Sequence, residues 1–295
     1  MQRQIIVVFL SLFWLVLAPA FGADRGALFK LAANGHTMYL FGTMHVGQPG
    51  FYPLEPRITA AVAGASTLAL EIDPTQDPAA MALALRAYGT AAPGATQGNM
   101  SPALRVRLKR ALDKAGIDSV AVAQFKPWLV ATVLAMAEYA SQGYRADLSV
   151  DSHLAQLARQ SKVPVIGLES PASQMSLFDR MSEPEQLVFL EESISVLESG
   201  KQSTEVREIA DAWSTADRRG FDQIAERVAS DTSVSGKFVK KVLLDERNVS
   251  LADKLAALLK REDKSVAAIG VLHLIGANSV PALLSARGVN VERVY

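Results

Sequence analysis

Apolar positions along the chain gather into six short runs, most of which end at a glycine, an asparagine or an acidic residue. The first run alternates apolar and polar positions at residues 27–33, and a second follows at 36–41, with Asn34-Gly35 between them. Because Asn-Gly favours two-residue hairpin turns, these runs predict an N-terminal β-hairpin. The other four runs predict short strands at residues 67–72, 164–168, 266–271 and 289–294.

The segments between the runs have helical patterns. Helices are expected at residues 53–63, 79–88, 102–115, 126–142, 151–159, 173–181, 184–199, 204–215, 221–230, 234–261 and 280–286. Asp151 is expected to cap the helix that starts there, and residues 92–99 favour a loop. Short strands separated by helices predict an α/β (α+β) fold, with a mixed central β-sheet, helices on both faces and large helical insertions.

The first residues have the pattern of a signal peptide rather than of a folded element. Arg3 precedes an apolar segment at residues 5–17, and small residues that permit cleavage follow at 18–22. The segment is shorter than the ~20 residues of a membrane-spanning helix, although an uncleaved anchor stays the alternative. We expect residues 1–22 to be a signal peptide and 23–295 a single domain, soluble, periplasmic or secreted, with no stable membrane anchor.

Composition restricts the chemistry further. The chain has no cysteine, which excludes disulfides, thiolate ligands, a cysteine nucleophile and a lipoprotein anchor. Any metal site must therefore use His, Asp, Glu or backbone oxygen. Thirty basic and 30 acidic side chains balance, so charge gives no argument for a nucleic-acid partner, and none is expected.

Four of the predicted strands end at a possible metal ligand: His45 in a Gly-x-x-His motif after Gly42, Glu71, Glu169, and His273 in a second Gly-x-x-His motif after Gly270. If the strands are parallel, these side chains meet at one edge of the sheet, where ligands bind in open α/β folds. Two imidazoles and two carboxylates suit a divalent ion, with positions left for water and substrate. Glu71 is the better ligand candidate, because its strand is most easily placed beside that of His45. Glu169 is a second ligand, a base or a partner of a ligand.

Each of these signals also has a simpler structural interpretation. A single Gly-x-x-His often belongs to a packed turn, but two copies after strand-like runs, in a chain with four histidines, favour a site. His36 beside the hairpin turn is expected to be exposed, and His153 to lie at a helix start. By pattern alone, Arg247 and Asn248 belong to a solvated helix face.

The motifs resemble the TraB/GumN family, in particular its bacterial exported members. The resemblance rests on segments spread over nearly all of the mature chain: 40–47, 51–54, 70–73, 126–128, Asp151, 167–169, 246–248 and 270–276. One departure is visible, because the second motif often reads Gly-x-Gly-His and Leu272 stands before His273 here.

The resemblance implies a metal-dependent hydrolase with His45, Glu71 and His273 at a divalent ion, which is Mn, Co or Zn. The group includes TIKI-type proteases, so a peptide or protein substrate is implied. Asp151, Arg247 and Asn248 are expected around the ligands, with Arg247 holding a substrate carboxylate through two hydrogen bonds. Distant relatives leave two alternatives open: a metal-free esterase-like hydrolase with a histidine base oriented by a glutamate, and a non-catalytic protein that binds haem or a peptide.

Overall fold

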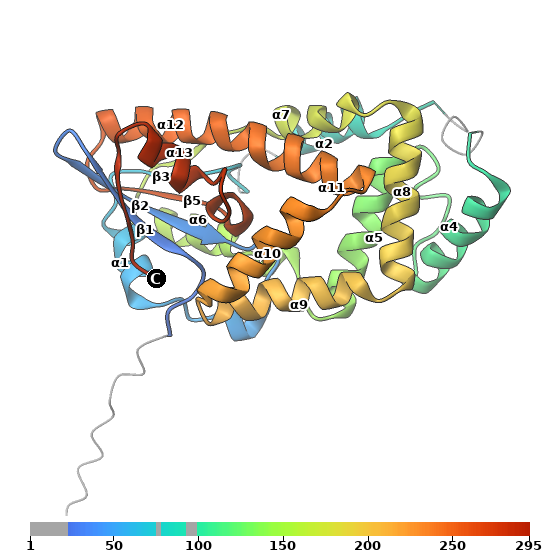
Figure 1. Cartoon of the computed structure of the whole chain (residues 1–295), viewed down its shortest axis with the longest axis horizontal. Coiled ribbons are helices and arrows are strands. Elements are labelled where there is room, and N and C mark those ends of the chain that lie inside the picture. The colour runs from blue at the N-terminus through green and yellow to red at the C-terminus, as the bar shows by residue number, and fades with distance from the viewer. Residues whose placement is uncertain (1–22, 75–77, 93–98) are drawn as a thin grey trace, which may run out of the picture.

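The computed structural model describes residues 23–74, 78–92 and 99–295 (Figure 1). The predicted signal peptide, residues 1–22, and most of the predicted loop at 92–99 lie outside the described residues. The strands are β1 Leu28–Ala33, β2 His36–Thr43, β3 Leu68–Leu70, β4 Val165–Gly167, β5 Ser265–Gly270 and β6 Asn290–Arg293. They form one sheet in the order β4-β3-β5-β2-β1-β6, and every one lies at a predicted run.

The sheet is mixed, as predicted. β1 and β2 form the N-terminal hairpin, in which Asn34 and Gly35 both have positive φ (53° and 80°), the conformation that an Asn-Gly turn supplies. β2, β5, β3 and β4 pair in parallel, so their carboxyl ends share one edge. The sequence analysis placed the strand before Glu71 beside the strand before His45. This prediction is wrong, because β5 lies between β2 and β3.

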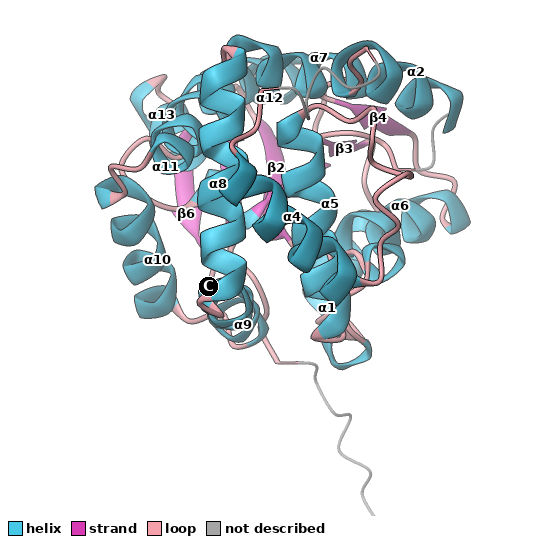
Figure 2. Ribbon diagram, turned by 90° about the vertical axis from the view of Figure 1, so that its right-hand side faces the viewer, coloured by secondary structure: helices cyan, strands magenta, loops and turns pink. Residues whose placement is uncertain are grey.

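Helices cover both faces of the sheet, as Figure 2 shows. α12 packs against β1, β2 and β5, whereas α1 and α6 pack together on β5, β3 and β4. The helices are α1 Pro56–Ala63, α2 Pro78–Gly89, α4 Pro102–Ala115, α5 Pro127–Ser141, α6 Val150–Gln160, α7 Pro171–Met175, α8 Glu183–Glu198, α9 Lys201–Ser214, α10 Arg218–Ser230, α11 Val234–Phe238, α12 Arg247–Arg261 and α13 Val280–Ala286.

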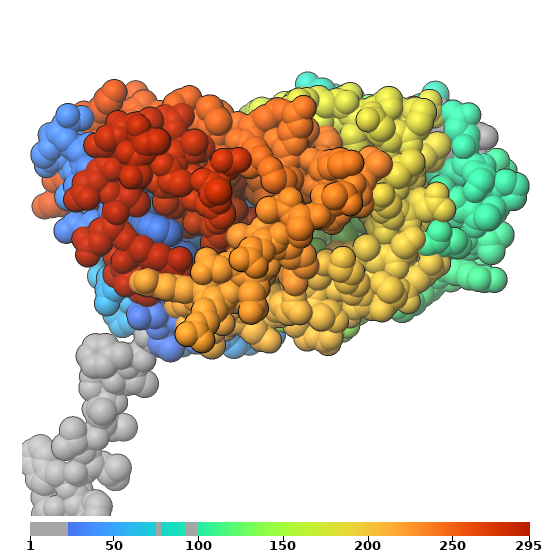
Figure 3. All heavy atoms as spheres, viewed as in Figure 1, coloured from blue at the N-terminus to red at the C-terminus, as the bar shows by residue number. Residues whose placement is uncertain are grey.

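Long helical segments interrupt the parallel sheet between β3 and β4 and again between β4 and β5, as the sequence predicts. The helices α4, α5 and α8 from these segments pack at the end of the molecule away from the sheet (Figure 1). They form a second core of buried side chains there, which includes Leu104, Leu134, Leu190 and Ile194. The first described residues and the last segment of the chain lie together at the opposite end, in blue and red in Figure 3.

Two details of the helices differ from the prediction. The cap of α6 is Ser149, whose Oγ accepts a hydrogen bond from the Ser152 N–H at 3.3 Å, and Asp151 lies in the first turn instead. The predicted helix at 234–261 is α11, a π-helical segment η4 at Val239–Glu246, and α12. The shorter 3₁₀ turns are η1 Pro49–Phe51, η2 Ala146–Leu148, η3 Ser176–Arg180 and η5 Val271–Leu274. Within the described ranges, no helix has the length and apolar character needed to cross a membrane.

Candidate functional site

The loop that carries His45 is fixed by contact with the segment before α6. The Gly47 N–H donates to the Arg145 carbonyl at 2.9 Å, and the Arg145 N–H donates back to Gly47 at 2.8 Å. A Cβ atom on Gly47 would lie 1.8 Å from the Leu148 carbonyl oxygen, so this close backbone approach requires glycine. The loop therefore leaves β2 in one defined direction.

The imidazole of His45 is held from one side by a carboxylate. Nδ1 of His45 lies 3.0 Å from Oδ2 of Asp151, and Oδ1 of Asp151 accepts a hydrogen bond from the Thr43 hydroxyl at 2.8 Å. The Asp151 charge raises the pKa of His45 to about 9. The His45 side chain is 61% exposed, whereas that of Asp151 is 11% exposed, so the ring faces solvent from a buried support.

The imidazole of His273 is held by an amide and is buried. Its Nδ1 lies 2.6 Å from Oδ1 of Asn248, whose Nδ2 donates to the Asn278 carbonyl at 2.8 Å. Because this fixes Oδ1 as the acceptor, Nδ1 of His273 carries the proton and Nε2 keeps a free lone pair. The side chain is 4% exposed, and burial lowers its pKa to about 4.

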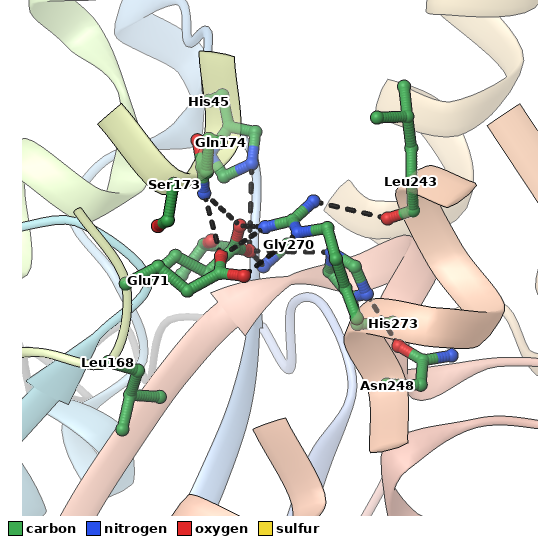
Figure 4. Close-up of polar contacts among 12 residues, drawn as sticks. His45, Glu71, Leu168, Ser173, Gln174, Leu243, Asn248, Gly270 and His273 are labelled. Atoms are coloured by element: carbon green, nitrogen blue, oxygen red, sulfur yellow. Dashed lines mark hydrogen bonds and ion pairs between the residues drawn. The ribbon is translucent and has the colours of Figure 1, made fainter. Parts of the chain in front are cut away.

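Glu71 lies between the two histidines (Figure 4). Its Oε1 is 3.7 Å from Nε2 of His45 and 3.8 Å from Nε2 of His273, and it accepts a hydrogen bond from the Gly270 N–H at 2.6 Å. A Cβ atom on Gly270 would lie 3.1 Å from Nε2 of His45 and 3.2 Å from Oε1 of Glu71. The glycine of the second motif thus leaves room for the side chains of His45 and Glu71 to approach each other.

The second oxygen of Glu71 belongs to a network around Arg247. Nη2 of Arg247 donates to Oε2 of Glu71 and, at 2.6 Å, to Oε2 of Glu169, while Nε donates to Oε1 of Glu169 at 3.1 Å. Nη1 donates to the Leu243 carbonyl at 3.2 Å. Glu169 therefore already fills the edge of Arg247 that was expected to hold a substrate carboxylate. Of the three roles expected for Glu169, this geometry favours the partner role.

The charges of this cluster do not balance without a cation. The cluster has three buried carboxylates, Glu71, Glu169 and Asp151, and one guanidinium. With neutral His273 the sum of charges is −1 while His45 is protonated, as its raised pKa favours, and −2 once His45 loses its proton. Burial opposes the ionisation of Glu71, but His45, His273 and Arg247, together with the hydrogen bond from the Gly270 N–H, outweigh it and lower the pKa of Glu71 to about 2. A net negative charge favours a bound cation over an anion.

His45, Glu71 and His273 offer two imidazole nitrogens and a carboxylate oxygen, which are the ligand types that Zn²⁺ and similar divalent ions prefer. Ligand bonds of about 2.1 Å in a tetrahedral site separate the ligand atoms by roughly 3.4 Å, a few tenths of an ångström less than the two separations at Glu71. Each Nδ1 is engaged by an oxygen acceptor, the arrangement that orients metal-binding imidazoles. In the part of the chain that the structure describes, no three His, Asp or Glu side chains lie close enough together to hold a metal ion. Binding needs a small inward movement.

Some residues of this cluster were not predicted from the sequence. The hydroxyl of Thr43 donates to Asp151, and the amide of Gln174 donates to Glu169. Gly270 was expected only as part of the second motif, and its backbone N–H donates to Glu71. Gln174 follows a Ser-Pro helix start directly after Glu169, a signal that would have found it.

The other two histidines lie outside the cluster. Nδ1 of His36 lies 2.9 Å from the Leu259 carbonyl, and His153 stacks on Tyr52 with ring centroids 4.4 Å apart.

The profile of the TraB/PrgY/gumN family matches residues 27–293, which is nearly the whole described chain. The chain belongs to this family. Uncharacterized protein YbaP of Shigella flexneri and of Escherichia coli (strain K12) are both 24% identical over 254 residues, 86% of this chain and 89% of theirs. No solved structure matches the chain. The predicted family is confirmed. The matched residues include all six strands and both long helical segments.

Proposed function

We propose that this TraB/PrgY/gumN protein is an exported hydrolase that uses a divalent metal ion at His45, Glu71 and His273 to cleave peptide bonds. The observation that carries the proposal is the approach of two imidazole nitrogens to one carboxylate oxygen, at 3.7 and 3.8 Å. When His273 is neutral, the free lone pair on its Nε2 faces another acceptor, Oε1 of Glu71. A cation between them removes this mismatch.

Each neighbouring residue has a defined part in this proposal. When bound, the ion would polarise a carbonyl group and acidify a water molecule. Asp151 and Asn248 hold the two rings by Nδ1, so that Nε2 of each is directed at Glu71. Arg247 neutralises part of the carboxylate charge and keeps Glu71 ionised. Because His45 is the exposed member of the set, the substrate reaches the site from the side of His45.

The substrate class and the export rest on other grounds. Peptide hydrolysis follows from the resemblance to TIKI-type proteases, and export follows from the signal-peptide pattern of residues 1–22. A fractionation experiment on the producing bacterium tests the second point. Processed protein found in the periplasm or medium supports it, and full-length protein kept in the cytoplasm contradicts it.

A metal-free hydrolase is the second candidate, because one observation favours it. Asp151 accepts a hydrogen bond from Nδ1 of His45, and the ring is exposed, which is the arrangement of a histidine general base and its orienting carboxylate. The orienting group is then an aspartate rather than the glutamate expected from the sequence.

Element analysis and activity separate these candidates. The protein comprising residues 23–295 is purified and analysed for Mn, Co and Zn, and then assayed on a peptide library with and without chelator. We expect one metal ion per chain and cleavage that the chelator abolishes, with both lost in folded His45→Ala and His273→Ala variants. Variants of the two histidines outside the cluster, His36→Ala and His153→Ala, serve as matched controls and keep both.

Three other outcomes have a defined meaning. Full metal content and activity in both His45→Ala and His273→Ala contradict the site. Cleavage that resists chelation but is lost in His45→Ala favours the metal-free hydrolase. Absence of cleavage together with an iron-porphyrin absorbance band on adding haem favours the non-catalytic binding protein.

A further inference from the structure

We infer that Gln174 is a positioning residue of this site, whose amide keeps the carboxylates of Glu71 and Glu169 together and so directs Oε1 of Glu71 at the two histidines. This inference rests on the proposed function, because it assigns Gln174 a part in preparing Glu71 for a cation. Nε2 of Gln174 lies 2.8 Å from Oε2 of Glu169 and 3.3 Å from Oε2 of Glu71. Figure 4 shows the Gln174 side chain beside Glu71.

The local sequence explains why Gln174 reaches the site. β4 ends immediately before Leu168 and Glu169, and α7 begins at once, with a capping box between Ser170 and Ser173 and a proline at the first helical position. The Gln174 N–H donates to the Ser170 carbonyl at 3.1 Å. One helical turn therefore returns the Gln174 side chain to the strand end that carries Glu169.

The segment after α7 is itself held in place. Phe178 stacks on Trp128 with ring centroids 4.3 Å apart and an interplanar angle of 14°. Arg180 binds Glu246, the residue before Arg247, at the end of the π-helical segment. These contacts connect α7 to the helix that supplies Arg247, so both donors to the carboxylates belong to one packed unit.

Two donors bridge the same pair of oxygen atoms. Nη2 of Arg247 and Nε2 of Gln174 both donate to Oε2 of Glu71 and to Oε2 of Glu169. An amide nitrogen has two protons, one for each carboxylate. Because the two anions repel each other, two bridging donors hold them at a fixed separation, and Glu71 cannot rotate Oε1 away from the histidines without losing both.

A neighbouring glutamine shows what a purely structural role looks like. Gln186, in α8, is buried, and its Nε2 donates to the Met181 backbone carbonyl at 3.1 Å. Gln174 is half-buried and donates instead to two ionised side chains. Loss of either amide removes hydrogen bonds, but only loss of the Gln174 amide changes the surroundings of Glu71.

The test is Gln174→Met, which keeps the length of the side chain and removes the amide, with Gln186→Met as the matched control. The first readout is the amide proton resonance of Gly270 in the metal-free protein, because this N–H donates to Oε1 of Glu71 at 2.6 Å. We expect an upfield shift in Gln174→Met, towards the position in Glu71→Gln, where the acceptor has lost its charge. The second readout is the affinity for Co²⁺ by calorimetry, with an expected loss of about 10- to 100-fold.

Gln186→Met is expected to leave both readouts unchanged while lowering stability. Gln174→Ala gives the same two readouts should the methionine variant not fold. A Gly270 resonance at its wild-type position in a folded Gln174 variant overturns the inference. Failure of the wild-type protein to bind Co²⁺ contradicts the proposed function instead, and the Gly270 resonance still decides the role of Gln174.

Discussion

The two Gly-x-x-His regions, residues 42–47 and 270–276, have the same motif but different surroundings. His45 follows the end of its strand as an exposed side chain between buried neighbours, is supported by a carboxylate, and has a raised pKa. His273 lies in a 3₁₀ turn beneath α12, is supported by an amide, and has a lowered pKa. A motif therefore defines which atom is offered to a ligand, while its surroundings decide the charge and exposure of that atom.

The difference suggests separate tasks for the two histidines within one proposed site. The buried, neutral His273 offers a fixed lone pair, and the exposed His45 is the member that substrate and solvent meet. The two glycines that begin the motifs differ in the same way. Gly270 leaves space between the ligands, whereas Gly42 leaves space for Val271 and Leu274 in the core.

Replacement of each of these two glycines by alanine should show the largest difference between the motifs, with Gly270→Ala affecting hydrolysis and Gly42→Ala affecting stability. In Gly270→Ala the new Cβ, 3.1 Å from His45 and 3.2 Å from Glu71, forces the ligand atoms apart. These atoms must then move apart by a few tenths of an ångström, where cation binding needs them to move together. We expect a loss of hydrolysis of up to about 100-fold, the cost of a 1 Å misplacement, with a small change in stability. In Gly42→Ala the Cβ would lie 2.9 Å from a Val271 methyl group, and overpacking should cost about 1–3 kcal/mol in urea unfolding. Equal effects of both variants on stability would contradict the distinction.

The two supporting residues should matter less than the ligands they orient. Asp151→Leu and Asn248→Leu are each expected to reduce the affinity for Co²⁺ by about 10- to 100-fold, since each removes the oxygen that accepts from Nδ1 of a histidine. Calorimetric titration measures this. Affinities that stay at the wild-type value would mean that neither Nδ1 contact orients a ligand.

Replacement of the buried His273 should lower the free energy of unfolding more than replacement of the exposed His45. His273→Ala leaves the Oδ1 of Asn248 buried without its donor and should cost about 1–3 kcal/mol of unfolding free energy. At a pH above the raised pKa of His45, about 9, the charge of this ring no longer contributes, and His45→Ala, which changes an exposed side chain, should then stay within about 0.5 kcal/mol. Urea denaturation of the metal-free variants gives both values, and a larger cost for His45→Ala would reverse the assignment.

The two histidines should also titrate on opposite sides of the ordinary histidine pKa in the metal-free protein. His45, with a pKa raised to about 9, stabilises the fold below pH 6.5, and this contribution is lost as the pH rises through 9. His273, with a pKa lowered to about 4, has the opposite sign, and its contribution is lost as the pH falls from 6.5 towards 4. NMR titration of the imidazole resonances checks the order, and coincident midpoints would contradict it.

Local patterns in the sequence determined the elements of this protein. Alternation located β1, Asn34-Gly35 located its turn, and all six strands lie where apolar runs predict them, because burial and turn geometry act over a few residues. The same patterns placed His45, Glu71, Glu169 and His273 at strand ends.

Only the tertiary structure decided how these ends combine. Insertion of β5 between β2 and β3 brings Gly270 between His45 and Glu71, and strand order is set by pairing between segments nearly 200 residues apart. The same holds for Arg247, which the pattern assigned to a solvated face and which binds Glu71 and Glu169 instead. Periodicity reports which face of an element is buried, but the partner of a buried charge depends on packing between distant elements.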